Sequence, residues 1–364
     1  MRFFMPVKLY HEADCVKKHS ALFAAAGTKA LVVTGRHSAG RNGSLSDVTA
    51  ALEAEGIALT LFDRVEENPS IETVMEAVKT GRQEKADFVI GIGGGSPMDA
   101  AKAAALLLHF PKEGADFLYD ANAAAEAAPH APLILIPTTC GSGSEATETS
   151  VLTVHKRRTK ISLPHKIFAD AALIDGKYLE GAPIEIIRST AVDALAHLWE
   201  SALNSSATPY SRMCAEAGLC VWGKIKDALL SLEERSLTTE ERNLLMQSSA
   251  MAGMAIAQTG TSLPHALSYA LTYDLHIPHG MAVGFFEAGY LEQVTKEERQ
   301  KVLRPAGFSS VAEWKEYYQV VCGRLVIPGE ELQRTMEMVA SNPGKMAKAP
   351  FACTEAVLRR VVYG

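Results

Sequence analysis

A strand that runs into three consecutive glycines and then into a proline-led helix constrains the fold more than any other part of this sequence. Residues 91–102 read Gly-Ile-Gly-Gly-Gly-Ser-Pro-Met-Asp-Ala-Ala-Lys. Glycines let backbone N–H groups approach a pyrophosphate closely, and the amino terminus of a helix favours an anion. Pro97 suits the first turn of that helix, where its missing N–H would be unpaired anyway. The alternative is a tight turn without a ligand, but the pattern favours phosphate binding.

Strand and helix signals alternate through the first half of the chain. The aliphatic runs are continuous, which is typical of strands buried on both faces of a sheet. We expect strands at residues 29–35, 58–62, 87–92 and 133–137, and helices at 45–55 and 69–85. The alternation predicts a parallel sheet with helices on both sides. The glycines do not follow the usual G-x-G-x-x-G spacing after the first strand, so an ordinary Rossmann domain is not implied.

A second polar loop follows the strand that ends near residue 137. Residues 137–147 read Pro-Thr-Thr-Cys-Gly-Ser-Gly-Ser-Glu-Ala-Thr, and their hydroxyls suit a phosphate, a ribose or an amide. Open α/β sheets bind ligands at the carboxyl ends of their strands, where this loop and the glycine loop are both expected. Helical signals replace strand signals near residues 178–184. The later helices are expected at residues 208–232, 238–258 and 354–363.

Four side chains of the helical half are of types that bind a divalent metal: Asp193, His197, His265 and His279. A spacing of four places the first two on one face of a helix, for which Ser189 and Thr190 offer capping hydroxyls. The other two stand at the head of a second helix and at a turn. One carboxylate and three imidazoles can bind Zn²⁺ or Fe²⁺ and keep a position open for substrate. Each residue alone is more commonly hydrogen-bonded in a core, and spacing does not prove that the four converge.

Composition and charge exclude several kinds of protein. A chain of 364 residues predicts two domains, and 48% hydrophobic with 21% charged residues suits a large core. The net charge of −6 argues against a nucleic-acid partner, and basic residues cluster only briefly at 156–160. No apolar run reaches the ~18 residues of a membrane span, and the amino-terminal run is too short for a signal peptide. Six cysteines without C-x-x-C spacing fit a reduced cytoplasm, which is the expected location.

Taken together, these motifs carry a family resemblance. G-G-G-S-P-M-D-A-A-K at 93–102, P-T-T-C-G-S-G-S-E-A-T at 137–147, V-D-A-L-A-H at 192–197 and the two-histidine segment 260–280 stand in family order. The stretch 67–70 extends the likeness toward the amino terminus. The sequence resembles the iron-dependent (group III) alcohol dehydrogenases, which are relatives of glycerol dehydrogenase and dehydroquinate synthase.

The resemblance implies an architecture and a reaction. The fold would be α/β plus all-α: a dinucleotide-binding parallel-sheet domain at residues 1–181 and a helical-bundle, metal-binding domain at 182–364, as in dehydroquinate synthase. A metal would lie in the cleft between them. The protein would be a homodimeric, metal-dependent oxidoreductase that transfers a hydride between a nicotinamide cofactor and a small primary alcohol, aldehyde or diol.

The resemblance also assigns site residues by position. The ligands of Fe²⁺, with Zn²⁺ as the alternative, would be Asp193, His197, His265 and His279. The residues that would contact or support the pyrophosphate are Gly94, Gly95, Ser96 and Asp99. The nicotinamide half would be lined by Thr138, Thr139, Ser144 and Thr147. Lys160 resembles the family lysine that reaches the cofactor, and Leu179 would touch the adenosine.

The sequence departs from the family pattern at the end of its first predicted strand. Members that prefer NAD typically carry an acidic residue there, which hydrogen-bonds the ribose hydroxyls and repels a 2′-phosphate. This chain has Gly35, followed by the potential donors Arg36, His37, Ser38 and Arg41. Because these donors suit a 2′-phosphate and no carboxylate opposes it, we expect NADP(H) to be preferred over NAD(H).

A second departure lies four residues after His265, where many members have a further histidine near the substrate. This chain has Tyr269, which does not titrate near neutral pH as a histidine does. The candidate catalytic side chains are therefore Tyr269 and His276, with the metal supplying most of the chemistry. Protons would move through water and the ribose hydroxyls or through His276, unless His276 is simply a surface residue before the turn.

Three other functions remain open at this stage. A glycerol dehydrogenase-like polyol oxidoreductase shares the same motifs. A non-redox lyase of the dehydroquinate synthase type would need several basic residues for a phosphorylated, carboxylated substrate, and the helical half shows no such cluster beside the metal motif. A non-catalytic nucleotide-binding protein would have no need of four intact metal ligands.

Overall fold

A computed structural model describes residues 3–125, 127–155 and 159–364, so most of the short basic cluster at 156–160 lies outside the described residues. The chain forms two compact units. The α/β unit comprises Met5–Thr139 and Gly143–Gly181. The helical unit comprises Ala182–Gly364, together with the short segment Cys140–Ser142 and the residues up to Phe4.

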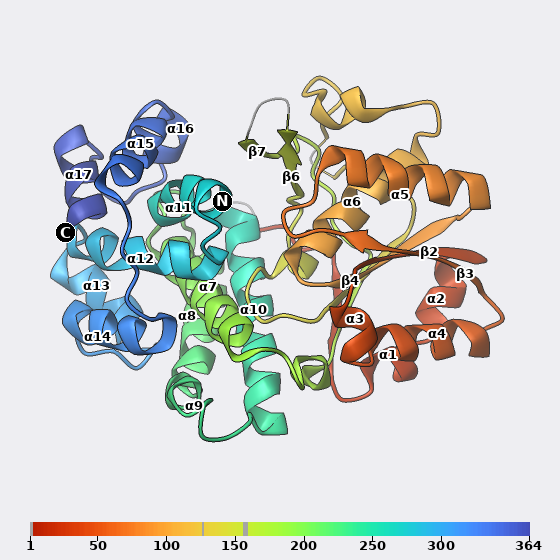
Figure 1. The fold of residues 1–364 in the computed structure, drawn as a ribbon, viewed down its shortest axis with the longest axis horizontal. Coiled ribbons are helices and arrows are strands. Elements are labelled where there is room, and N and C mark those ends of the chain that lie inside the picture. The colour runs from red at the N-terminus through yellow and green to blue at the C-terminus, as the bar shows by residue number, and fades with distance from the viewer. Residues whose placement is uncertain (1–2, 126, 156–158) are drawn as a thin grey trace. The chain divides into compact units, whose positions relative to one another are not determined.

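The α/β unit is built on a parallel sheet, as the sequence predicts. In the described part of the chain its strands follow the order β1-β8-β5-β4-β2-β3, and all neighbours are parallel (Figure 1). Their bounds are Lys8–His11 (β1), Lys29–Gly35 (β2), Ala58–Val65 (β3), Phe88–Gly93 (β4), Leu133–Pro137 (β5) and Ala171–Ile174 (β8). A separate antiparallel hairpin, β6 (Val151–Val154) with β7 (Thr159–Ser162), follows the second polar loop.

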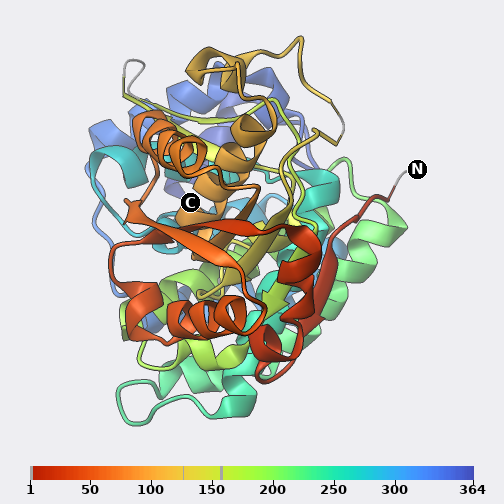
Figure 2. The ribbon, with the colours of Figure 1, turned by 90° about the vertical axis from the view of Figure 1, so that its right-hand side faces the viewer.

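Helices cover both faces of this sheet, and Figure 2 shows the two sets on opposite sides. One face carries α1 (Cys15–Lys18), α2 (Ala21–Ala26), α3 (Ser38–Arg41) and α4 (Ser44–Ala54). The other carries α5 (Ile71–Glu84) and α6 (Gly95–His109). The strands β4 and β5 are buried along their whole length, which is why they consist of continuous aliphatic residues and glycine.

The helical unit is all-α after residue 182 in the described chain, as predicted. Its helices are α7 (Ile184–Leu203), α8 (Pro209–Gly223), α9 (Lys226–Leu230), α10 (Thr239–Thr259), α11 (Leu263–Asp274), α12 (His279–Glu292), α13 (Lys296–Leu303), α14 (Val311–Cys322), α15 (Gly329–Ala340), α16 (Pro343–Met346) and α17 (Glu355–Tyr363). Helix α7 packs against α8, α10 and α12 and is buried along most of its length. Trp199 of α7 is fully buried, and its indole N–H donates to the carbonyl of Val302 at 3.0 Å.

Two sequence predictions about the helical unit are wrong. Helix α7 begins at Ile184, so Ser189 and Thr190 lie inside the helix and cap nothing. The Thr190 hydroxyl instead donates to the carbonyl of Ile186 one turn back, a bond that hydroxyl side chains commonly make within helices. The single helix expected at 208–232 is divided into α8 and α9 after Gly223, where the backbone of Pro305 lies too close for any side chain.

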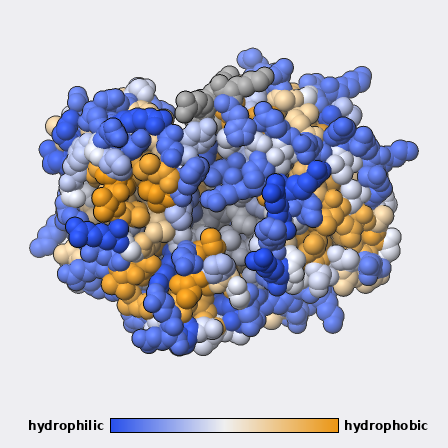
Figure 3. Space-filling view, in the orientation of Figure 1, coloured by the Kyte–Doolittle hydropathy of each residue, from blue (hydrophilic) through white to orange (hydrophobic). Residues whose placement is uncertain are grey.

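No helix in the described part of the chain is both long and apolar enough to span a membrane. On the face drawn in Figure 3, hydrophobic residues form separate patches among hydrophilic ones. Individual exposed residues such as Val326 (85%) and Met213 (61%) are of the kind that most protein surfaces carry singly.

Candidate metal centre

Helix α7 supplies the first two candidate ligands. Asp193 and His197 are four residues apart, and only 6% and 5% of their surfaces are exposed. The Nδ1 atom of His197 lies 4.0 Å from Oδ2 of Asp193 and 3.3 Å from the carbonyl oxygen of Gly141. Gly141 can approach this closely because it lacks a side chain: a Cβ there would lie 2.7 Å from the carbonyl oxygen of Thr190. The helical spacing predicted from the sequence therefore brings these two groups to one buried position.

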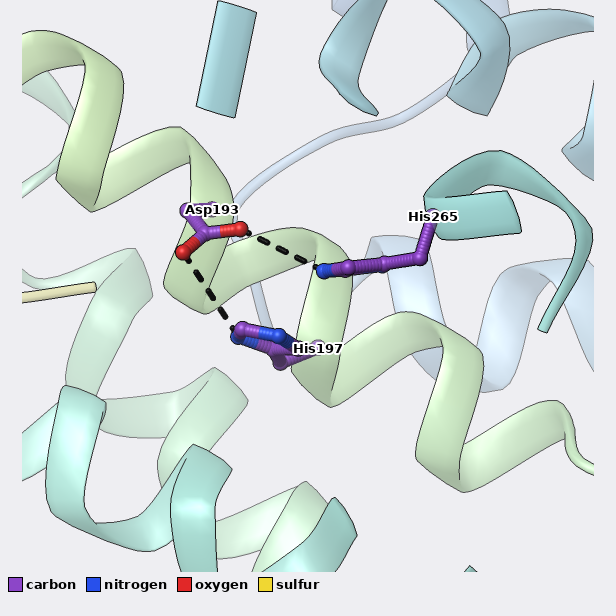
Figure 4. A group of neighbouring side chains, drawn as sticks. All are labelled: Asp193, His197 and His265. Atoms are coloured by element: carbon purple, nitrogen blue, oxygen red, sulfur yellow. Dashed lines mark ion pairs between the residues drawn. The ribbon is translucent and has the colours of Figure 1, made fainter. Parts of the chain in front are cut away.

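Helix α11 adds His265 to this pair. Ser262 precedes the helix and Pro264 stands in its first turn, which places His265 near the helix start. Its Nε2 atom lies 3.3 Å from Oδ1 of Asp193, and its ring stacks on that of His197 with a centroid distance of 4.2 Å. Figure 4 shows the three side chains pointing toward one another. One ligand atom from each lies within 4.8 Å of the others, which is close enough for a single ion.

His279, the first residue of α12, stands beside these three. Its Nε2 atom lies 3.8 Å from Oδ1 of Asp193, and its ring centroid lies 5.5 Å from that of His265. The side chain is 33% exposed, so it is the most accessible of the four. The following residue, Gly280, explains how α12 reaches this position: a Cβ there would lie only 1.8 Å from the carbonyl oxygen of Ser189 in α7.

The electrostatics of the group favour a cation. Burial by itself would raise the pKa of Asp193, but the neighbouring His197 and His279 and the contact with His265 hold it far below the ordinary value. Burial lowers the pKa of His197, whereas carboxylates around His265 raise the pKa of that residue well above its usual range despite burial. Both Asp193 Oδ1 and His265 Nε2 are buried without a hydrogen-bond partner among the described residues. A divalent ion that takes one carboxylate and several imidazoles fits these atoms.

In the α/β unit, the glycine loop at residues 93–96, which is predicted to bind phosphate, joins β4 to α6. Gly93 has a φ of +148°, and a Cβ on it would lie 2.6 Å from the ring of Pro97, so only glycine fits without strain. A Cβ on Gly94 would lie 3.0 Å from the hydroxyl of Thr139, which places the glycine loop directly against the second polar loop. The structure thus brings these two predicted loops together at the carboxyl ends of adjacent strands, with Gly95 and Ser96 in the first turn of α6.

A buried lysine that the sequence analysis did not single out organises the second loop. Lys102, fully buried on α6, donates to the Ser144 hydroxyl at 2.8 Å, to the Thr147 hydroxyl at 3.2 Å and to the Thr149 carbonyl at 2.8 Å. Burial lowers the pKa of Lys102 to about 8. Asp99 accepts the Ser144 hydroxyl at 2.7 Å, so the hydroxyls of Ser144 and Thr147 support the loop. Their contact with a nicotinamide stays a prediction.

Asn68 connects Lys160 on β7 with the glycine loop by hydrogen bonds to both. Its Nζ atom donates to the side-chain oxygen of Asn68 at 2.6 Å, and the backbone N–H of Asn68 donates to the Ser96 hydroxyl at 3.0 Å. Asn68 adopts a left-handed backbone with φ of +58°, which asparagine tolerates better than most residues. Burial lowers the pKa of Lys160 to about 8. The sequence signal for Asn68 is its place in the family-like stretch 67–70.

The residues predicted to select the cofactor lie at and beyond the end of β2. Gly35 is the last residue of the strand, and the side chains that follow it are exposed: Arg36, His37, Ser38 and Arg41. A Cβ on Gly35 would make only ordinary contacts, at 3.5 Å from the carbonyl oxygen of Val65. Leu179, predicted to touch the adenosine, is 2% exposed in a short 3₁₀ turn, Gly176–Leu179.

The structure separates the two candidate catalytic side chains. The ring of Tyr269 is nearly parallel to that of His279, with 6.1 Å between the centroids and an angle of 16°. His276 is exposed in the turn before α12 and has a φ of +53°. Tyr269 therefore stands beside a predicted metal ligand. His276 is instead a surface residue before α12, which was the alternative to a catalytic role for it.

Comparisons with known proteins agree with this arrangement. The family model described as iron-containing alcohol dehydrogenase matches residues 6–176, and that of the Fe-containing alcohol dehydrogenase family, C-terminal, matches 187–321. An NADPH-dependent butanol dehydrogenase of Clostridium saccharobutylicum is 31% identical over 81% of this chain and 74% of the relative. A sulfoacetaldehyde reductase of Bilophila wadsworthia is 33% identical over 72% of this chain and 67% of the relative. A crystal structure of an iron-containing alcohol dehydrogenase from Thermotoga maritima superposes with a TM-score of 0.88 at 34% identity, covering 99% of this chain and 98% of the other.

Proposed function

The chain belongs to the iron-containing alcohol dehydrogenase family, and we propose that it is a metal-dependent oxidoreductase that transfers a hydride between NADP(H) and a small primary alcohol or its aldehyde. The observation that carries the proposal is the convergence of Asp193, His197 and His265 from two helices, with His279 beside them. Asp193 Oδ1 and His265 Nε2 lie 3.3 Å apart and are buried without a hydrogen-bond partner among the described residues, and a bound cation would compensate for the burial of both atoms.

In this proposal the four side chains hold the ion and the protein controls access to it. A bound Fe²⁺ or Zn²⁺ supplies Lewis acidity, which lowers the pKa of an alcohol or polarises an aldehyde carbonyl. Asp193 contributes the negative charge, and the buried imidazoles of His197 and His265 exclude water from one side. The partly exposed His279 marks the side from which a small substrate would approach.

Protein side chains would contribute little acid–base chemistry. Tyr269 occupies the position of the additional family histidine, and its ring packs beside His279. The role of Tyr269 in this proposal is to shape the approach to His279, and protons move through water and the ribose hydroxyls.

The nucleotide would bind at the edge of the sheet in the α/β unit. Gly94, Gly95 and Ser96 offer backbone N–H groups at the start of α6 to the pyrophosphate. Thr138 and Thr139 follow the end of the adjacent strand β5, and in this proposal they line the nicotinamide half of the site. The donors after Gly35 would bind a 2′-phosphate, and one relative that resembles this chain is named as NADPH-dependent.

The competing functions are less well supported. The relatives named above are a dehydrogenase and a reductase, which favours a redox reaction over a lyase of the dehydroquinate synthase type. A polyol in place of a simple alcohol is the second candidate substrate, because the ligand set would be the same. A homodimer and a cytoplasmic location also belong to the proposal.

Steady-state kinetics of metal-reconstituted protein tests the proposal. NADPH and NADH are compared against short aldehydes and glyceraldehyde, with and without a chelator, by the absorbance of the reduced nicotinamide. We expect turnover that favours NADPH and disappears with chelator. A His265→Ala variant should lose both its metal and its activity. Chelator-resistant turnover, or a variant that keeps metal and turnover, would contradict the metal-dependent mechanism.

A further inference from the structure

A fully buried carboxylate lies behind His265, and no predicted motif accounts for it. Glu200 stands on α7, one turn after His197, and 0% of its surface is exposed. One of its carboxylate oxygens contacts Nδ1 of His265, and the other accepts the backbone N–H of Ser262. Ser262 immediately precedes α11, so Glu200 holds both the start of this helix and the imidazole near it.

The chemistry of this contact determines which nitrogen of His265 faces Asp193. A carboxylate can only accept hydrogen bonds, so Nδ1 of His265 must be the donor. In a neutral imidazole with its proton on Nδ1, the lone pair available to a metal is on Nε2. That nitrogen lies 3.3 Å from Oδ1 of Asp193, and both atoms are buried without a hydrogen-bond partner among the described residues.

We propose that Glu200 is a positioning residue of the metal centre: by accepting the Nδ1 proton of His265, it orients the imidazole and presents Nε2 to the ion. The inference rests on the metal-dependent function proposed above. Histidine ligands commonly donate their second ring N–H to a carboxylate, which fixes the tautomer and strengthens the metal bond. Burying a carboxylate costs free energy unless the group is paired and hydrogen-bonded. Glu200 meets both conditions, because it pairs with His265 and accepts the backbone N–H of Ser262 at the start of α11.

A neighbouring residue provides a matched control. Glu287 on α12 is also 0% exposed, and burial together with the negative charge of Glu200 raises its pKa well above the ordinary value. Glu287 therefore favours its neutral form beside Glu200, and neither of its carboxyl oxygens has a hydrogen-bond partner among the described residues. A Glu287→Gln variant replaces this carboxyl group by a neutral amide of the same size and leaves Glu200 with its contacts to Ser262 and His265. In a Glu200→Gln variant an NH₂ group, which is a donor, replaces one of the two oxygens that accept from Ser262 and from His265, so one of these two contacts is lost in the observed arrangement.

The test compares Glu200→Gln and Glu287→Gln with the unmodified protein. Each is stripped with a chelator and titrated with Co²⁺ against a competing chelator, and the visible spectrum of bound Co²⁺ and the unfolding temperature of the stripped form are recorded. We expect Glu200→Gln to bind Co²⁺ about 10–100-fold more weakly, with an altered spectrum. The Glu287→Gln variant should keep both the affinity and the spectrum of the unmodified protein.

Each outcome decides a different point. A folded Glu200→Gln variant that binds Co²⁺ as tightly as the unmodified protein overturns the positioning role and leaves the metal-dependent function intact. Equal losses in both variants also overturn it, because they indicate a general effect of disturbing the buried carboxyl pair. If the unmodified protein binds no Co²⁺, the proposed function and this inference both fail.

If Glu200→Gln does not fold, the unmodified protein decides the question. Zn²⁺-loaded protein carrying ¹⁵N-labelled histidine reports which ring nitrogen is protonated, and the His265 signals are identified by their absence from a His265→Gln sample. A protonated Nδ1 with metal-bound Nε2 supports the proposal, whereas metal-bound Nδ1 overturns it.

Discussion

At the scale of single residues, Gly35 offers the sharpest test of cofactor choice. A Cβ there would lie 3.5 Å from the carbonyl oxygen of Val65 and 3.8 Å from Pro97, so a side chain can be added without strain. In Gly35→Asp, the carboxylate would accept ribose hydroxyls and repel a 2′-phosphate. Repulsion between unit charges at ~4 Å costs about 1–4 kcal/mol near a protein surface, and every ~1.4 kcal/mol is tenfold. We therefore expect the ratio of kcat/KM for NADPH over NADH to fall by about tenfold or more.

Gly35→Ala is the control for this substitution, because it adds a Cβ without a charge and should leave the ratio unchanged. A Gly35→Asp protein that still prefers NADPH by the same factor would show that the donors after Gly35 do not bind a 2′-phosphate.

We predict that nucleotide binding depends on pH through the protonation of Lys160. Burial lowers the pKa of this amine from 10.5 to about 8. It is therefore charged below that pH, where it would attract the nucleotide that is predicted to bind beside it, and it loses its proton above that pH. Because the bound anion raises the pKa of the lysine again, binding takes up a proton, and the affinity falls as pH rises. We expect Kd for NADPH to be flat near neutral pH and to increase above pH ~8 by up to tenfold per unit.

Fluorescence titration of NADPH across this pH range measures the effect. A Lys160→Arg variant keeps its charge throughout, so its profile should be flat. If the variant shows the same rise as the unmodified protein, another group is responsible.

At the scale of elements, the packing of α12 against α7 depends on Gly280. A Cβ at this position would lie 1.8 Å from the carbonyl oxygen of Ser189 and 3.0 Å from Cβ of Asp193. In Gly280→Ala the two helices must move apart, which typically costs about 1–3 kcal/mol of stability. Because the helices carry His279 and Asp193, we also expect weaker metal binding, measured by denaturant unfolding and by Co²⁺ titration.

Gly329 is a suitable control for this prediction, since it stands at the start of helix α15 and a Cβ there would meet nothing within 4 Å. Gly329→Ala should change neither quantity. A Gly280→Ala protein with unchanged stability and affinity would show that α7 and α12 can separate without disturbing the ligands.

At the scale of the whole molecule, the two units carry separate binding residues. The four predicted metal ligands lie in the helical unit, and the glycine loop lies in the α/β unit. Hydrogen exchange should therefore slow in α7, α11 and α12 when Zn²⁺ is added, and around residues 94–96 when NADPH is added. A ligand at a hundredfold excess over its Kd stabilises the folded state by about 2.7 kcal/mol. Protection by Zn²⁺ confined to the α/β unit would contradict the proposed ligand set.

The sequence by itself determined the class of the molecule. Continuous aliphatic runs and their alternation with helix signals predicted a parallel sheet followed by an all-helical half, and both are confirmed. The strands β2 and β5 have the bounds expected. The family resemblance, read from four motifs, is also confirmed. These features are local: burial on both faces, glycine and proline at turns, and helical spacing each act over a few neighbouring residues.

Tertiary structure decided which distant groups meet. The strands β1 and β8 pair with each other although most of the α/β unit lies between them, and both are too short to stand out in the sequence. Helical spacing placed Asp193 beside His197, but only the packing of the helices brought His265 to these two residues. The same packing brings His265 to Glu200, from which it is separated by 65 residues of chain. Lys102 reaches Ser144 in the same way. Such contacts depend on how whole helices and strands pack, so no local pattern of residues predicts them.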